Sequence, residues 1–151
     1  PQIFFNSNSK LLFKGRLFYV SKRSPKCSDA DIEKILQVSV ENNAKKNITG
    51  VLLYSKEKFL QCIEGELSHL LALYDKIKLD SRHSEAIMLG LVPVKERNFP
   101  SWQMAGKSVD LNKVDFKSQM SAAESEEFES ILSGKASSAE RVSKIIQLFF
   151  K

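Results

Sequence analysis

Alternating and helical patterns of apolar positions predict a strand and then a helix near the start of the chain. Within residues 16–22, Leu17, Tyr19 and Ser21 share one face, which is the period of a β-strand. Ser28, with an aspartate three residues later, predicts a helix start with a capping box. The stripe of one helix face then continues to about residue 45: Ile32, Ile35, Leu36, Ser39, Val40 and Asn43.

The next segment predicts two antiparallel strands and a second helix. After a turn at residues 47–50, strands are expected over residues 51–55 and 59–64, joined by a short polar link of hairpin length. Gly65 is expected to end the second of these strands. A helical stripe follows and ends near Asp80: Leu67, Leu70, Leu71, Tyr74 and Ile77.

A fourth strand is predicted over residues 85–94, and Pro100 then breaks the chain. Trp102 and Met104 share one face of a short fifth strand. The order βαββαβ plus a strand is typical of the α+β class with a ferredoxin-like fold, in which both helices pack on one face of the sheet.

Two further helices are predicted near the end of the chain. Ser121 starts one that stops at Gly134, and Ser137 starts the other. We expect the second to cover the open face of the sheet with an apolar stripe: Val142, Ile145, Ile146 and Phe149. The predicted organisation is an N-terminal extension over residues 1–14, a domain over 15–106 and a helical extension over 107–151.

Polar side chains occupy positions where the pattern calls for apolar ones. Ser39 and Asn43 lie in the stripe of the first helix, Gln61 shares a face with flanking apolar residues, and Tyr19 shares a face with Leu17. A buried polar group without a partner costs about 1–3 kcal/mol. Tyr19, Gln61 and Asn43 are therefore expected to converge on one spot, where a planar ligand with donors and acceptors would satisfy them.

Each of these positions also has a structural interpretation. A half-buried tyrosine on a strand, such as Tyr19, is more often a core residue whose hydroxyl reaches the surface. Gln61 is compatible with an exposed strand edge, and Ser39 with Asn43 is compatible with a hydrated side of the helix. The pattern alone leaves these alternatives open.

Composition and charge narrow the class of protein. The 151 residues are 42% hydrophobic and 27% charged, as expected for one globular domain. No apolar run approaches the ~18 residues of a membrane span, and no signal peptide is evident. The net charge of +5 is spread along the chain, which is poor evidence for nucleic-acid binding. Cys27 and Cys62 indicate a reducing compartment, so we expect a cytoplasmic protein. Because no pair of ligands among the cysteines and histidines has zinc spacing, we expect no metal site. The lack of an apolar span predicts no membrane contact.

Six blocks of residues, in order, resemble the BLUF domain, a flavin-binding blue-light sensor, over roughly residues 16–106. They are Tyr19 and Ser21; Ser39, Asn42 and Asn43; Ile48 to Tyr54; Phe59 to Gly65; Asp80, Arg82 and His83; and Arg97, Phe99, Trp102 and Met104. The resemblance implies a ferredoxin-like fold, FAD as the cofactor, with FMN or riboflavin possible in its place, and a flavin ring between the two helices.

The resemblance also implies roles for individual residues. Tyr19 matches the electron and proton donor, Gln61 the glutamine between tyrosine and flavin, and Asn43 the asparagine at the flavin carbonyl edge. Trp102 and Met104 match residues that relay the signal. The remaining matches line or support the pocket, and the last of them replaces an arginine of some relatives: Ser39, Asn42, Asp80, Arg82, His83 and Lys76.

The resemblance implies that the protein regulates a partner and has no enzymatic activity of its own. The residues after Gly106 are too few for a catalytic domain, so we expect a separate effector protein or the chain's own homo-oligomer as the partner. A ferredoxin-like small-ligand regulatory domain without a photocycle is the alternative. An acylphosphatase would need a phosphate cradle that the loop after Arg23 lacks, and RNA binding would need aromatic side chains where Gln61 and Cys62 stand.

Overall fold

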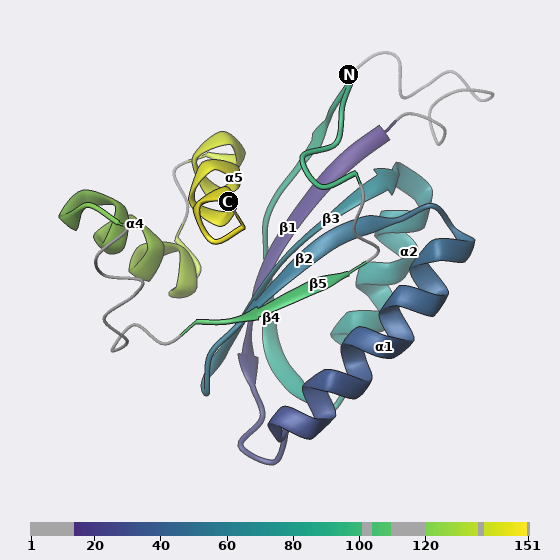
Figure 1. The fold of residues 1–151 in the computed structure, drawn as a ribbon, viewed down its shortest axis with the longest axis horizontal. Coiled ribbons are helices and arrows are strands. Elements are labelled where there is room, and N and C mark those ends of the chain that lie inside the picture. The colour runs from purple at the N-terminus through teal and green to yellow at the C-terminus, as the bar shows by residue number, and fades with distance from the viewer. Residues whose placement is uncertain (1–13, 101–103, 110–119, 136–137, 151) are drawn as a thin grey trace.

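The computed structural model describes residues 14–100, 104–109, 120–135 and 138–150. Its elements are β1 (Lys14–Arg23), α1 (Asp29–Lys45), β2 (Thr49–Tyr54), β3 (Lys58–Glu66), α2 (Leu67–Lys78), β4 (His83–Pro93), β5 (Ala105–Ser108), α4 (Ala122–Leu132) and α5 (Ala139–Leu148). Figure 1 shows their arrangement. No helix among the described residues is long and apolar enough to cross a membrane.

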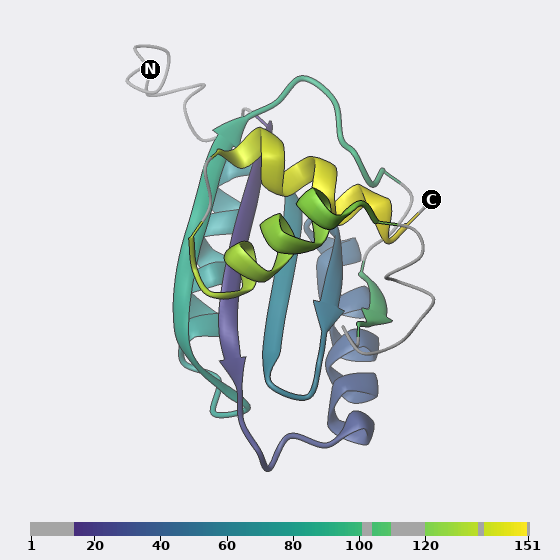
Figure 2. The ribbon, with the colours of Figure 1, turned by 90° about the vertical axis from the view of Figure 1, so that its left-hand side faces the viewer.

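The described strands form a five-stranded sheet in the order β4-β1-β3-β2-β5. β1 pairs antiparallel with β3 and β4, β2 pairs antiparallel with β3, and β5 adds to β2 in parallel. Helices α1 and α2 cover one face, and α4 and α5 lie over the other (Figures 1 and 2). The predicted ferredoxin-like arrangement and the two C-terminal helices are confirmed.

Each face of the sheet has its own hydrophobic core, because strand side chains alternate. Leu17 and Tyr19 of β1 face α1 and α2, and Phe18 and Val20 face the C-terminal helices. The predicted α5 stripe is buried against the second face, where burying one large apolar side chain contributes about 1.5–3 kcal/mol. The C-terminal helices therefore complete the fold.

Several predicted boundaries were wrong. Gly65 does not end β3, because it pairs with Gly15 of β1 and the strand continues for one more residue. Strand β5 begins only after Met104, and Trp102 lies outside the described residues. The N-cap of α5 is Ser138, whose side chain accepts a hydrogen bond from the backbone three residues ahead. Short strands and caps depend on partners that a local pattern does not contain.

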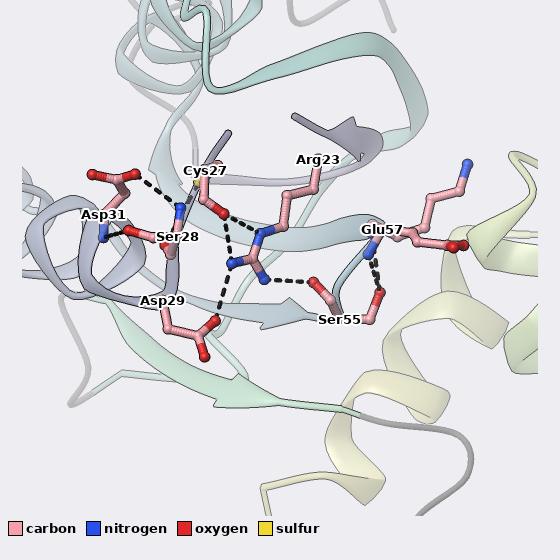
Figure 3. Close-up of polar contacts among 8 residues, drawn as sticks. Arg23, Cys27, Ser28, Asp29, Asp31, Ser55 and Glu57 are labelled. Atoms are coloured by element: carbon pink, nitrogen blue, oxygen red, sulfur yellow. Dashed lines mark hydrogen bonds and ion pairs between the residues drawn. The ribbon is translucent and has the colours of Figure 1, made fainter. Parts of the chain in front are cut away.

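The turn from β1 into α1 is fixed by the buried guanidinium of Arg23 (Figure 3). Its Nε and Nη2 donate to the carbonyl of Cys27 at 3.0 and 2.7 Å, and its Nη1 donates to the carbonyl of Ser55 at 2.7 Å. Nη2 also lies 3.0 Å from an Asp29 oxygen. Just beyond this turn, Ser28 forms the predicted capping box. One side chain thus joins β1, the start of α1 and the β2–β3 hairpin.

Arg23→Ala is expected to lower the free energy of unfolding by about 2–3 kcal/mol, because two buried carbonyls lose a charged donor. Arg23→Lys should restore only part of this loss, since one ammonium cannot reach acceptors on three segments. Urea denaturation measures the difference. The exposed Lys22→Ala, which breaks one long ion pair of 3.8 Å, is the control and should stay within about 0.5 kcal/mol. If Arg23→Ala lowered the free energy of unfolding as little as this control does, the structural role of the Arg23 guanidinium would be contradicted.

Candidate functional site

A cavity lies between α1 and α2 above the central strands, with an empty volume of about 530 Å³ including its open mouth. Both helices and the sheet contribute apolar walls, and polar side chains are interspersed among them. The lining residues are Tyr19, Ile35, Ser39, Asn43, Leu52, Phe59, Gln61, Leu73, Ile77, Asp80, Arg82 and His83. Apolar walls with a few placed polar groups suit a flat ligand with a polar edge.

Tyr19 and Gln61 form a buried polar pair on the floor of this cavity. They are direct partners in the antiparallel register of β1 and β3, so their side chains emerge on the same face. The Tyr19 hydroxyl donates to Gln61 Oε1 at 2.5 Å. Burial raises the pKa of Tyr19, and the nearby Tyr74 and Asp80 raise it further. Tyr19 is therefore a neutral phenol that holds its proton toward Gln61.

The amide end of Gln61 faces the chain segment that leads into β5. Gln61 Nε2 donates to the sulfur of Met104 at 3.2 Å, and the Met104 side chain is buried. Thioether sulfur is a weak acceptor, so breaking this contact costs less free energy than breaking the hydrogen bond to Tyr19. Gln61 thus connects the cavity floor to the residue directly before β5.

Glu64 holds the same segment further upstream. Its fully buried carboxylate accepts from the Nε of Arg16 and from the backbone N–H groups of Asn98 and Phe99, each at 2.8 Å. Arg97 adds bonds to the carbonyls of Asn47 and Glu64, at 2.6 and 3.2 Å. The chain that leaves β4 is therefore fixed over β3 a few residues before Met104.

Helix α1 contributes Asn43 and Ser39, one helical turn apart, to one wall of the cavity. Asn43 is buried, and Ser39 is half-buried. The structure thus brings Tyr19, Gln61 and Asn43 to one cavity, as the polar pattern predicted. It favours the shared-site interpretation over an exposed edge or a hydrated helix side.

Asp80 and Arg82 form a bidentate pair at the end of the cavity near the start of β4. Arg82 Nε lies 2.9 Å from Asp80 Oδ1, and Nη2 lies 2.6 Å from Oδ2. The hydrogen bond from the Arg82 side chain is the main reason that the pKa of Asp80 is lowered, against the opposing effect of burial. The pair therefore presents guanidinium N–H donors and carboxylate acceptors to a ligand in a fixed orientation.

Titration of Asp80 should show the effect of this pair. Because the pKa is lowered in the folded state, the pair stabilises the fold above the unfolded value of about 3.9, and this contribution is lost as the pH falls through the folded pKa. Carboxyl NMR should place the midpoint below that value, and Arg82→Met should raise it. Lys78→Met, whose ammonium pairs with Asp75, should leave it in place. An unchanged midpoint in Arg82→Met would refute this explanation.

Two residues implied by the resemblance do not reach the cavity, and their role stays a prediction. The side chains of Asn42 and Lys76 are exposed, and neither lines the cavity. The residues that sequence reasoning did not assign to the site are mainly its apolar walls: Ile35, Leu52, Phe59, Leu73 and Ile77. The helical stripes and strand periods include these positions, but an apolar period does not distinguish the wall of a cavity from the core.

Comparisons with known proteins agree with this geometry. The family profile "BLUF: Sensors of blue-light using FAD" matches residues 15–105. Subunit beta of a photoactivated adenylate cyclase from Euglena longa is 31% identical over 96 residues, which cover 63% of this chain and 11% of that protein. The chain therefore spans only a small part of this curated relative.

Two solved structures resemble most of the chain. The dark-state structure of BlrB, a BLUF protein, has 29% identity and a TM-score of 0.74, covering 92% of this chain and 96% of that one. The photo-activated state of BlsA has 26% identity and a TM-score of 0.75, covering 89% and 92%.

The fold and the lining residues together define a ferredoxin-like domain with a cavity between its two helices. Because the family profile matches residues 15–105, the chain belongs to the BLUF family of blue-light flavin sensors. The resemblance seen in the sequence is confirmed.

Proposed function

We propose that this chain senses blue light with FAD bound in the cavity between α1 and α2, and that Tyr19 and Gln61 are its photoactive residues. The observation that carries the proposal is the buried 2.5 Å hydrogen bond from Tyr19 to Gln61 on the cavity floor. Asn43 would hold a polar edge of the flavin, and the supporting residues would be Ser39, Asp80, Arg82 and His83. Asn42 and Lys76, which the resemblance also implies as cofactor-binding residues, are exposed, and their role stays a prediction.

The donor set fits a flavin. The isoalloxazine ring is flat and apolar on its faces, with carbonyl and N–H groups on one edge, and the cavity combines apolar walls with amide, carboxylate and guanidinium groups. Bound flavin would supply light absorption and a strong oxidant in its excited state. The protein would supply orientation, a neutral tyrosine and a site shielded from water.

Tyr19 would donate an electron and its hydroxyl proton, and the proton would leave along the existing bond to Gln61 Oε1. Gln61 suits this place because its amide has a donor end and an acceptor end that rotation or tautomerism exchanges. If the ends exchange, the N–H that now faces the sulfur of Met104 turns away from it. The switch would then reside in hydrogen bonds, with no substrate consumed.

Met104 directly precedes β5, and Lys107 of β5 donates to the carbonyl of Phe149 at the end of α5 at 2.7 Å. We therefore propose that a change at Gln61 passes through β5 to the C-terminal helices, with Met104 as the first relay residue and Trp102 as a second. The receiver would be an effector protein or another copy of the chain. In this proposal the chain regulates a partner in the cytoplasm and catalyses no reaction itself.

The absorption spectrum of the purified protein, before and after blue light, tests the function. A yellow protein whose flavin bands shift to the red and relax in the dark supports the proposal, and release of the flavin by denaturation followed by chromatography identifies FAD, FMN or riboflavin. A yellow protein without a shift refutes the photocycle. A protein that stays colourless with added FAD favours a small-ligand regulatory domain instead.

A further inference from the structure

Ser21 is a buried hydroxyl beside the cavity that the proposed function does not use. It follows Tyr19 by two residues on β1, so both side chains lie on the same face. In the register of β1 and β3, Ser21 pairs with Phe59 as Tyr19 pairs with Gln61. Only 1% of Ser21 is exposed, so its hydroxyl needs a partner inside the protein.

That partner is the imidazole of His83. Its Nδ1 lies 2.7 Å from Ser21 Oγ, and its Nε2 contacts the carbonyl oxygen of Ile77 in α2. A carbonyl oxygen only accepts, so Nε2 carries the hydrogen. In the neutral ring Nδ1 then accepts the hydrogen of the Ser21 hydroxyl. Both ring nitrogens are thus occupied by the protein, on opposite sides of the ring.

An irregularity at the start of β4 brings His83 to this position. Val20 of β1 pairs with Ile87 of β4, and Lys22 pairs with Ser84. Between these two pairs β1 has one residue, Ser21, whereas β4 has two, Glu85 and Ala86. Glu85 has φ of +52°, the left-handed region that non-glycine residues seldom adopt. Bulges of this kind turn the side chains that precede them. The strand entry is therefore shaped to place His83 over Ser21.

The held ring forms part of the cavity wall. Its centroid lies 6.3 Å from that of Tyr19 and 6.2 Å from that of Phe59, which it meets edge to face. His83 therefore stands beside the Tyr19–Gln61 pair without a nitrogen available to it. An imidazole with a free nitrogen at this place would compete for the hydrogen bonds of that pair.

We propose that Ser21 is a positioning residue that, together with the Ile77 carbonyl, fixes the Nε2–H form of His83 and keeps Nδ1 away from the Tyr19–Gln61 pair. The consequence for dark recovery rests on the proposed function. Ser21 would thus set the rate of recovery by excluding a competing acceptor, and His83 would serve as an inert part of the wall.

Nitrogen-15 NMR of the imidazoles in the dark protein tests the first half. His69→Gln removes the other histidine and so assigns the signals. His83 should show a protonated Nε2 and an unprotonated Nδ1. Ser21→Ala should shift the Nδ1 signal, Ser21→Thr should restore it, and Ser84→Ala, an exposed neighbour, should leave it alone. If Ser21→Ala does not fold, Ser21→Cys takes its place as a weak donor. An unchanged Nδ1 signal would overturn the proposal.

Dark-recovery kinetics test the second half. Recovery in Ser21→Ala should be about three to ten times faster, the factor that corresponds to one hydrogen bond, and Ser21→Thr should recover at the original rate. In a His83→Phe background, Ser21→Ala should have no further effect. An equal acceleration in that background would overturn the proposal, because Ser21 would then act without His83. A protein with the expected NMR signals and no photocycle would refute the proposed function alone.

Discussion

Tyr19→Phe is expected to keep flavin bound and to abolish the reversible red shift. The substitution removes one hydroxyl and leaves the ring that packs 5.5 Å from Tyr74, so the shape of the cavity is preserved. What is lost is the O–H that donates to Gln61 Oε1 and, with it, the proton that would accompany the electron. Difference absorption spectroscopy after a blue-light pulse measures the result.

Gln61→Leu should have the same effect, because it removes the amide bridge and leaves a shorter, apolar side chain. The matched control is Tyr74→Phe, because Tyr74 is a second buried tyrosine beside Tyr19 that does not line the cavity. It should retain the full shift. A normal photocycle in Tyr19→Phe or Gln61→Leu would remove that residue from the mechanism, whereas loss of the shift in all three variants would point to general damage.

Glu64→Ala is expected to lower the free energy of unfolding by about 3–5 kcal/mol, the usual cost of breaking a buried ion pair by removing one partner. The guanidinium of Arg16 would lose its carboxylate, and two backbone N–H groups, those of Asn98 and Phe99, would lose their acceptors. Urea denaturation with a linear extrapolation measures this loss.

Glu64→Gln should be intermediate, because the amide still offers one oxygen acceptor. Glu57→Ala, at an exposed hairpin position, should change stability by no more than about 0.5 kcal/mol. A loss below about 1 kcal/mol for Glu64→Ala would show that the segment before Met104 is held by other contacts. Tyr19 and Gln61 lie outside this network, so flavin binding by the folded variant separates the two effects.

The central site was predictable because it follows from strand and helix periods. Once two hairpin strands are placed beside β1, Tyr19 and Gln61 fall on one face, and the stripe of α1 adds Asn43. The same helical period explains why Asn42 points away, since neighbours on a helix differ by about 100°. The resemblance implied a role at the pocket for Asn42, whereas the apolar stripe of the first helix did not contain it.

Other features could not be read from the chain. The pairing of Ser21 with His83 joins residues 62 positions apart and depends on a bulge in an edge strand. The start of β5 depends on a parallel partner, β2, that lies about 50 residues earlier, so no local period marks it. Long-range pairing of this kind is visible only in the folded chain.

The opposite orientation of neighbouring side chains on β1 has a consequence for how such proteins diversify. Tyr19 lines the cavity between α1 and α2, while Phe18 and Val20 on either side of it pack in the core under α4 and α5. Substitutions on the two layers touch different neighbours, and effects at separate sites tend to add. If the proposed function holds, the surface formed by α4 and α5 would therefore be able to change, by evolution or by design, while the residues of the cavity stay the same.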